Sequence, residues 1–208
     1  MTTKQHAISL LILFCIVLFL IRSFYTQSVF LGFLLWNIVL ATIPYIVSEY
    51  LQKVNLSKIK TSSIICIWLL FLPNSPYIIT DFIHLHNSES TLIWYDLFMV
   101  FSFAFTGLLL AIISMYDIYL IIQQKWSLKT ANLSIIIISF LCGYGIYLGR
   151  FLRLNSWYIF TKPVNTLQQI ATSLLNQQAW YISLGFGALL YLIFYVFKTF
   201  QPIKASGL

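Results

Sequence analysis

The chain has 208 residues, of which 60% are hydrophobic and only 8% are charged. A water-soluble domain needs charged surface to cover its core, so this composition excludes an ordinary soluble fold and indicates a protein solvated by lipid. The net charge of +7 comes from basic residues spread over short loops. They indicate anionic membrane lipids, rather than a nucleic acid, as partners.

Uncharged stretches of bilayer length locate the predicted spans, because a helix needs about 20 residues to cross the hydrocarbon. Lys4 and Arg22 enclose 17 uncharged residues, and Arg22 and Glu49 enclose 26. Asp96 and Asp117 enclose another 20. An open sheet would leave backbone groups unpaired in lipid, so we predict an all-α, polytopic transmembrane bundle forming one membrane domain. The six predicted spans are residues 5–21, 29–48, 62–80, 95–117, 131–148 and 179–198.

The third predicted span is broken by two prolines, Pro73 and Pro76. Each lacks an N–H and crowds the carbonyl four residues earlier, so carbonyls such as that of Leu72 are expected to lose their helical partners. Membrane proteins tolerate broken backbone where protein or a water-filled cavity satisfies it, and transporters build sites there. The alternative is a simple kink in which Asn74 and Ser75 cap the resumed helix.

Acidic and imidazole side chains gather after this break. Asp81 and His84 are three residues apart, so a continuing helix places them on one face, and Asp96 begins the next span across a short loop. Together they suit an acid–base pair oriented by a carboxylate or, with His86 and Glu89, a metal shell of oxygen and nitrogen ligands. Asp81, His84 and Asp96 are therefore the candidate catalytic residues, while the metal and any cofactor stay unassigned.

Two arginines follow the fifth predicted span. If the spans alternate, Arg150 and Arg153 lie at the same membrane face as Asp81 and Asp96. Guanidinium groups bind phosphate or carboxylate through two parallel hydrogen bonds, so a lipid phosphate or a phosphorylated ligand is one candidate. The structural alternative is that the arginines neutralise the two acids in ion pairs that hold helices together.

Three further features carry expectations of their own. Asp117 is expected to be an exposed polar helix terminus, with a role in proton movement as the alternative. The long loop 149–178 has apolar residues at helical spacing, which predicts a short interfacial helix. Cys15, Cys66 and Cys142 all fall within predicted spans and are interpreted as packing residues.

Three motifs occur together between residues 62 and 157. They are the proline-broken run 73–84 with its Thr-Asp and His, the Trp-Tyr-Asp sequence at 94–96, and Gly-Arg-Phe-x-Arg-x-Asn-Ser-Trp at 149–157. The combination resembles the bacterial multi-pass membrane proteins catalogued as domain of unknown function 1361. The resemblance implies no known activity, but it implies that these residues belong to the family pattern: Asn74, Asp81, His84, Asp96, Arg150, Arg153 and Asn155.

The sequence thus predicts a polar cluster near the outer membrane interface that binds an anionic or lipid-linked ligand. Eight basic residues on the side of the termini against four on the other side place both termini in the cytoplasm. The alternatives are a small proton-coupled transporter and a non-catalytic membrane assembly partner, and whether the protein is an enzyme stays open. The candidate ligand-binding residues are Asn74, Arg150, Arg153 and Asn155.

Overall fold

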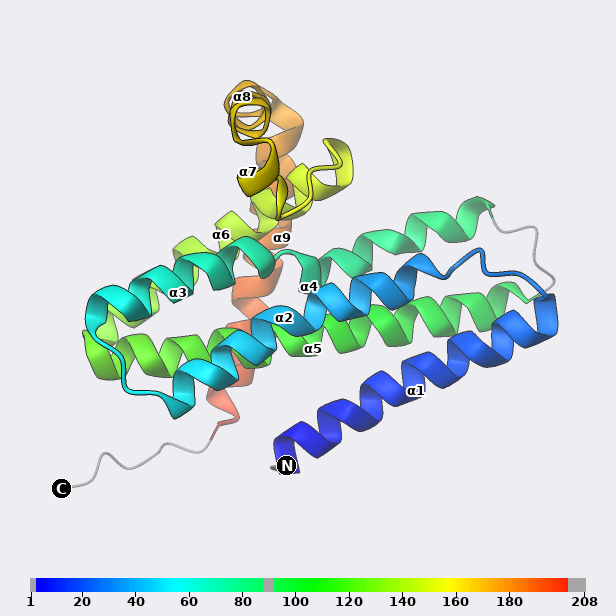
Figure 1. Ribbon diagram of the computed structural model, residues 1–208, viewed down its shortest axis with the longest axis horizontal. Helices are drawn as coiled ribbons and strands as arrows, with labels where there is room; N and C mark the ends of the chain where they lie inside the picture. The colour runs from blue at the N-terminus through cyan, green and yellow to red at the C-terminus, as the bar shows by residue number, and fades with distance from the viewer. Residues whose placement is uncertain (1–2, 88–91, 202–208) are drawn as a thin grey trace.

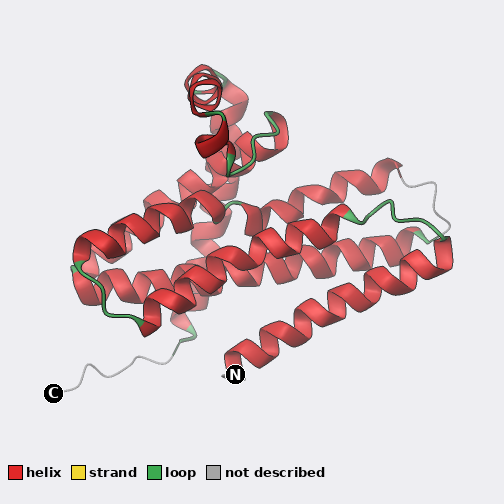
Figure 2. Ribbon diagram, in the orientation of Figure 1, coloured by secondary structure: helices red, strands yellow, loops and turns green. Residues whose placement is uncertain are grey.

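The computed structural model describes residues 3–87 and 92–201, and the secondary structure within these ranges is entirely helical (Figures 1 and 2). The predicted all-α fold is therefore confirmed. The elements are α1 (Thr3–Thr26), α2 (Phe33–Lys53), α3 (Lys58–Phe71), α4 (Asn74–Tyr77), the 3-10 helix η1 (Ile78–Asn87), α5 (Ile93–Lys125), α6 (Leu128–Phe151), α7 (Tyr158–Thr161), α8 (Pro163–Ser173) and α9 (Gln177–Thr199).

Six helical segments of the described chain are long and apolar enough to cross a membrane, as predicted. Their outer surfaces carry large apolar side chains, among them Leu13 and Leu20 of α1, which are 55% and 57% exposed. Lipid is the solvent that suits such a surface. The fourth segment is part of a helix that continues to Lys125, beyond residue 117, where the sequence analysis ends the predicted span.

Helix α5 is the central element, because it packs against α1, α2, α4, η1, α6 and α9. Figure 1 shows α1, α2 and α5 running along the long axis, with α9 crossing that direction steeply and α7 and α8 projecting to one side. We name the two ends of the bundle after the charged residues of α1. The Arg22 end is where α1 ends and α5 begins, and the Lys4 end is where α1 begins.

Glycines allow α6 and α9 to approach closely. A Cβ atom at Gly143 would lie 2.5 Å from the backbone oxygen of Ser183, and one at Gly187 would lie 2.9 Å from Cα of Phe140. Small residues at such crossings are the usual means of packing helices in lipid, where no hydrophobic effect drives them together. This crossing holds α6 in position, and α6 carries Arg150 at its end.

The third span is broken where the two prolines predicted it. Helix α3 ends at Phe71, α4 provides one turn, and η1 continues in the tighter 3-10 geometry. The carbonyl of Leu72 accepts from Ser75 N at 3.0 Å instead of losing its partner. Asn74 and Ser75 do not cap the resumed helix as expected: the Asn74 side chain donates to Phe71 O at 2.9 Å, and Ser75 Oγ donates to Ala41 O of α2 at 2.8 Å.

The broken segment is seated against two glycines. A Cβ atom at Gly107 of α5 would collide with the backbone oxygen of Ser75, and one at Gly145 of α6 would collide with the ring of Pro73. Because any larger residue would push α4 outward, these glycines allow α4 to lie deep between α5 and α6. The broken span therefore forms a fixed wall for the site described next.

Candidate functional site

A cavity of about 780 Å³ lies toward the Arg22 end, bounded by α2, α3, α4, η1, α6, α7 and α8. This volume is typical of a site for a small organic molecule. Apolar side chains form one part of its wall, and polar side chains gather in another part. The principal polar lining residues are Asn37, Asn74, Tyr77, His84, Tyr144, Arg150, Arg153, Asn155 and Ser156.

Asp81 is buried behind the polar part of the wall, with only 1% of its surface exposed. Its Oδ2 accepts from Asn37 Nδ2 at 2.7 Å, and its Oδ1 lies 3.3 Å from Nη1 of Arg150. A buried carboxylate is stable only when charged or hydrogen-bonding partners compensate for its lost hydration. Asp81 therefore joins α2, η1 and α6, and it fixes the guanidinium of Arg150 at the edge of the cavity.

His84 lies beside the same guanidinium. Its Nε2 is 3.5 Å from both terminal nitrogens of Arg150, and its ring lies 4.8 Å from the ring of Phe33. An arginine has no acceptor, so Nε2 can serve this contact only with its lone pair. The geometry therefore suits a neutral imidazole whose proton is on Nδ1. The guanidinium also faces the Tyr77 ring, 6.0 Å from its centroid.

Arg153 is exposed and has the backbone conformation that normally belongs to glycine. Its φ is 54°, immediately after Leu152 closes α6. Glycine is the usual residue at this position because it lacks the Cβ that the left-handed conformation crowds. No other described residue makes an ion pair with the Arg153 side chain. The cavity therefore has one guanidinium that Asp81 compensates and a second that has no such partner in the described part of the chain.

Asn74 and Ser156 close the wall at the break. Asn74 Nδ2 donates to Phe71 O and to Ser156 Oγ at 3.0 Å, and Ser156 Oγ donates to Leu70 O at 3.0 Å. Both hydrogens of the Asn74 amide are thereby used, which leaves it without a donor for a ligand. These bonds satisfy the last carbonyls of α3 and anchor the loop that carries Arg153 and Asn155.

Most of the sequence-predicted site residues come together. Asn74, His84, Arg150, Arg153 and Asn155 line the cavity, and Asp81 lies directly behind it. Asp96 is not among the described lining residues.

Asp96 instead pairs with Arg22 of α1, at 2.8 Å between Nε and Oδ1. Arg150 and Asp81 thus form the ion pair of the structural alternative, whereas the ion pair of Asp96 is with Arg22, an arginine that the structural alternative does not include.

A metal shell is not formed by the described residues. No three His, Cys, Asp or Glu side chains among them lie close enough together to hold an ion. Glu89, which we had considered as a ligand with His86, lies outside the described residues.

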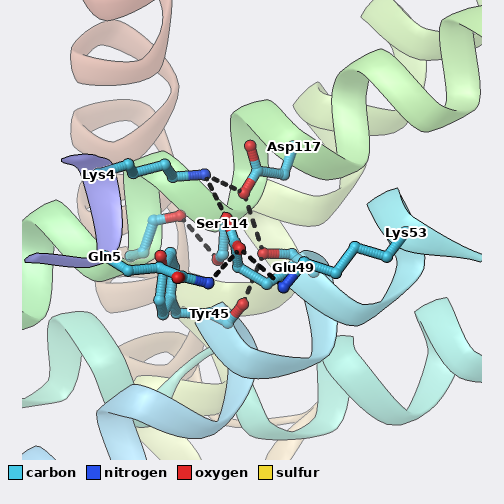
Figure 3. Close-up of polar contacts among 9 residues, drawn as sticks. Lys4, Gln5, Tyr45, Glu49, Lys53, Ser114 and Asp117 are labelled. Carbon is cyan, nitrogen blue, oxygen red and sulfur yellow. Dashed lines mark hydrogen bonds and ion pairs between the residues drawn. The ribbon is translucent and has the colours of Figure 1, made fainter. Parts of the chain in front are cut away.

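A second polar cluster lies at the Lys4 end, between α1, α2 and α5 (Figure 3). Lys4 Nζ binds Asp117 Oδ2 at 2.7 Å and Glu49 Oε1 at 3.0 Å. Ser48 Oγ donates to the same Asp117 oxygen at 3.2 Å. Asp117 is only 4% exposed, so its expected place at an exposed helix terminus is wrong. The physical reason is that α5 continues beyond it and Lys4 covers it.

The cysteines differ in their surroundings. Cys15 and Cys142 are fully buried, as expected of packing residues, with Cys15 Sγ 3.4 Å from Thr106 Oγ1. Cys66 is exposed and lines the cavity, so its interpretation as a packing residue is wrong. It is therefore the accessible thiol among the three.

Four of the principal polar lining residues were not among the candidate site residues of the sequence analysis: Asn37, Tyr77, Tyr144 and Ser156. Asn37 lies within a long uncharged stretch, and polar groups inside a span usually have a partner. That signal indicates a role, but it does not identify Asp81 as the partner. The helix predicted in the loop 149–178 is present as α8, whose Ile170 oxygen accepts from the Tyr144 hydroxyl at 3.1 Å, while its place at the membrane interface stays a prediction.

The comparisons with known proteins yield one match. A family model described as "Protein of unknown function (DUF1361)" matches residues 36–193. No curated protein and no solved structure matches the chain.

Proposed function

The chain belongs to this family of proteins of unknown function, and we propose that it is a multi-pass cell-membrane protein that binds an anionic ligand at the outer membrane interface. Arg150 and Arg153 are the proposed ligand-binding residues. The observation that carries the proposal is a cavity of about 780 Å³ whose polar wall includes two guanidinium groups. Among the described residues, one buried carboxylate, that of Asp81, lies beside Arg150.

The balance of charge favours an anion. Arg150 is held by Asp81, which orients its guanidinium and leaves 18% of its side chain exposed. Arg153 adds a positive charge with no carboxylate opposite it among the described residues. Phosphate and carboxylate both accept paired hydrogen bonds from guanidinium groups, and the partly dehydrated setting strengthens each bond.

The position along the spans favours the membrane interface. Arg150 follows 20 uncharged residues after Lys129, which is one hydrocarbon thickness of helix. The ligand groups therefore meet Arg150 where headgroups and water begin. The excess of lysines on the side of the termini supports an orientation with both termini in the cytoplasm and the cavity outside.

His84 and Asp81 have different proposed roles. A neutral His84 beside Arg150 is placed to accept a proton or a hydrogen bond from a ligand held by that arginine. Asp81 is a positioning residue, because Arg150 and Asn37 separate it from the cavity.

The transport alternative requires a polar route between the two bundle ends. The acids at these ends, Asp96 and Asp117, are separated on α5 by 20 uncharged residues. Each of these two carboxylates forms an ion pair with a basic residue of α1. Binding at one interface accounts for the arrangement with fewer assumptions. The assembly-partner alternative predicts that Arg150 and Arg153 affect only protein abundance.

Binding of phosphatidate to the purified protein in phosphatidylcholine nanodiscs tests the proposal. Native mass spectrometry of the parent protein is expected to show preferential retention of dioleoyl phosphatidate. Replacing both arginines, Arg150→Gln with Arg153→Gln, is expected to weaken that binding at least tenfold, because each charged hydrogen bond contributes about 1.5–3 kcal/mol.

The matched control is Lys162→Gln. Lys162 is an exposed cation at the same end of the bundle, where it faces the Tyr158 ring outside the cavity. Its removal should leave phosphatidate binding unchanged. Equal loss in the control and in the arginine variant would reduce the effect to general surface charge and overturn the proposal.

A further inference from the structure

The apolar part of the cavity extends away from the arginines along the spans. Leu141 and Arg150 both line the cavity on α6, and nine residues of helix between them correspond to about 13 Å. Cys66 and Leu69 form the facing wall on α3. The cavity therefore runs from the headgroup level to a depth of nearly half the hydrocarbon, which is about 30 Å thick.

The deep part of the cavity is continuous with the outer surface of the bundle. Leu141 is 46% exposed although it lines the cavity, and Cys66 is exposed as well. Helix α3 packs mainly on α2 and has few contacts with α6. A gap between α3 and α6 thus connects the apolar wall with the surface that faces lipid.

We propose that this apolar part holds the hydrocarbon chain of a phosphate-bearing membrane lipid, which enters between α3 and α6 with its headgroup at Arg150 and Arg153. The inference rests on the proposed function and specifies its ligand class. Positive groups lie at the interface and apolar side chains lie deeper, which is the polarity of a lipid in a bilayer. A free anion would use only the two arginines and would make no contact with the apolar wall.

Helix α8 covers the part of the cavity in which the headgroup is proposed to bind. Its Thr166 and Ile170 line the cavity, while Val164 and Leu167 are 79% and 56% exposed. An amphipathic helix of this kind lies in the membrane interface with its apolar face toward acyl chains. The Tyr144 hydroxyl fixes α8 over the cavity through Ile170 O and through Ser173 Oγ at 2.6 Å.

Cys66 makes the inference measurable in the unmodified chain. Cys15 and Cys142 are fully buried, so N-ethylmaleimide should react first with Cys66. We expect dioleoyl phosphatidate in phosphatidylcholine nanodiscs to slow this reaction several-fold. Glycerol 3-phosphate, which has the same headgroup without chains, should leave the rate unchanged at concentrations that compete for the arginines.

A pair of variants on α6 provides the second measurement. Leu141→Trp fills the deep part of the cavity and should weaken phosphatidate binding at least fivefold while leaving glycerol 3-phosphate binding intact. Leu133→Trp is the matched control, because Leu133 is 59% exposed on the same helix and does not line the cavity. Thermal unfolding of both variants shows whether each is folded.

The outcomes separate the two proposals. Phosphatidate that binds through the arginines but neither protects Cys66 nor responds to Leu141→Trp overturns the chain-binding inference and leaves the anion site standing. Phosphatidate that binds no better than phosphatidylcholine, or that ignores Arg150→Gln with Arg153→Gln, overturns the proposed function itself. Protection of Cys66 that persists in the arginine variant indicates a chain groove without an anion site.

Discussion

Arg22 and Asp96 join α1 to α5 through two hydrogen bonds, 2.8 Å from Nε to Oδ1 and 3.2 Å from Nη2 to Oδ2. Toward the other end of the same two helices, Lys4 binds Asp117 at 2.7 Å. The two cations are 18 residues apart on α1 and the two acids are 21 apart on α5. These separations correspond to about 27 and 32 Å of helix, close to the thickness of the hydrocarbon. Ion pairs therefore fix α1 to α5 at two levels, one hydrocarbon thickness apart.

Breaking the buried pair at the Arg22 end should destabilise the protein strongly. In Asp96→Asn the Arg22 guanidinium, whose side chain is 4% exposed, keeps its charge and loses its partner. The expected loss is about 3–5 kcal/mol in the free energy of unfolding, because an uncompensated charge stays buried. The double variant Arg22→Met with Asp96→Leu should recover most of this loss. Thermal unfolding in detergent measures both, and a double variant as unstable as the single one would contradict the explanation.

Lys4 should matter far more than Lys53, although both contact Glu49. Lys4 is shared between Glu49 and Asp117, whose side chains are only 12% and 5% exposed, and Lys4→Met leaves both acids without it. Lys53 is 64% exposed and 3.8 Å from Glu49, so Lys53→Met should change the unfolding free energy by less than about 1 kcal/mol. Melting temperatures of the two variants test the difference. Similar melting temperatures would show that α1 does not depend on this contact.

Two glycines of α9, two residues apart on either side of Phe186, should respond in opposite directions to alanine. Gly187→Ala places a Cβ 2.6 Å from Phe140 Cδ1, which should separate α6 from α9 and destabilise the bundle by about 1–3 kcal/mol. A Cβ at Gly185 meets no atom within 4 Å. Gly185→Ala should therefore stabilise the protein by about 0.4–1 kcal/mol through the unfolded chain. Equal effects of the two substitutions on thermal unfolding would contradict the close crossing.

Charge-free windows and proline chemistry were sufficient to predict the spans and the break in the third one. Both signals are local: hydrocarbon excludes charges along a helix, and Pro73 and Pro76 remove their own hydrogen bonds. The helix α8 was predictable for the same reason, from the helical spacing of its apolar residues. The exposure of Asp117 was predicted wrongly because a charge was interpreted as a helix terminus, whereas Lys4 compensates this carboxylate inside the bundle.

The site was predictable as a set of residues and not as a set of contacts. Asp81, His84 and Arg150 do meet, because topology brings the ends of the third and fifth spans to one end of the bundle. Topology also brings Arg22 to that end, and the choice of Arg22 over Arg150 as the partner of Asp96 depends on helix packing. Likewise, no pattern in the sequence indicated that the amide of Asn37 donates to Asp81. Pairing across helices is a property of three-dimensional packing that spacing in one dimension does not determine.

The orientation of the bundle should be visible to a thiol reagent that cannot cross membranes. In a Cys66→Ser background, Gln168→Cys places an exposed thiol on α8 beside the cavity, and Gln124→Cys places one near the end of α5 at the opposite end of the bundle. Intact cells should label the first and not the second, and permeabilised cells should label both. The reverse pattern would place the cavity in the cytoplasm.

Replacing Arg153 with glycine should affect the stability of the protein and its phosphatidate binding in opposite directions. An L residue in the left-handed conformation loses about 1–2 kcal/mol relative to a relaxed backbone, and glycine avoids this strain at a smaller entropic loss of about 0.5–1 kcal/mol. Arg153→Gly should therefore leave the melting temperature unchanged or raise it, while phosphatidate binding falls. A strained residue whose side chain makes no ion pair with any described residue is best explained by the ligand it serves.

Arg153→Ala separates the side chain from the backbone. Alanine removes the same guanidinium but keeps the Cβ that crowds a φ of 54°. Both variants should therefore lose phosphatidate binding to the same extent, and only the glycine variant should gain stability relative to the alanine variant. If Arg153→Gly and Arg153→Ala instead both melt well below the parent protein, the arginine stabilises the end of α6 itself. The charge at this position would then belong to the fold and not to the site.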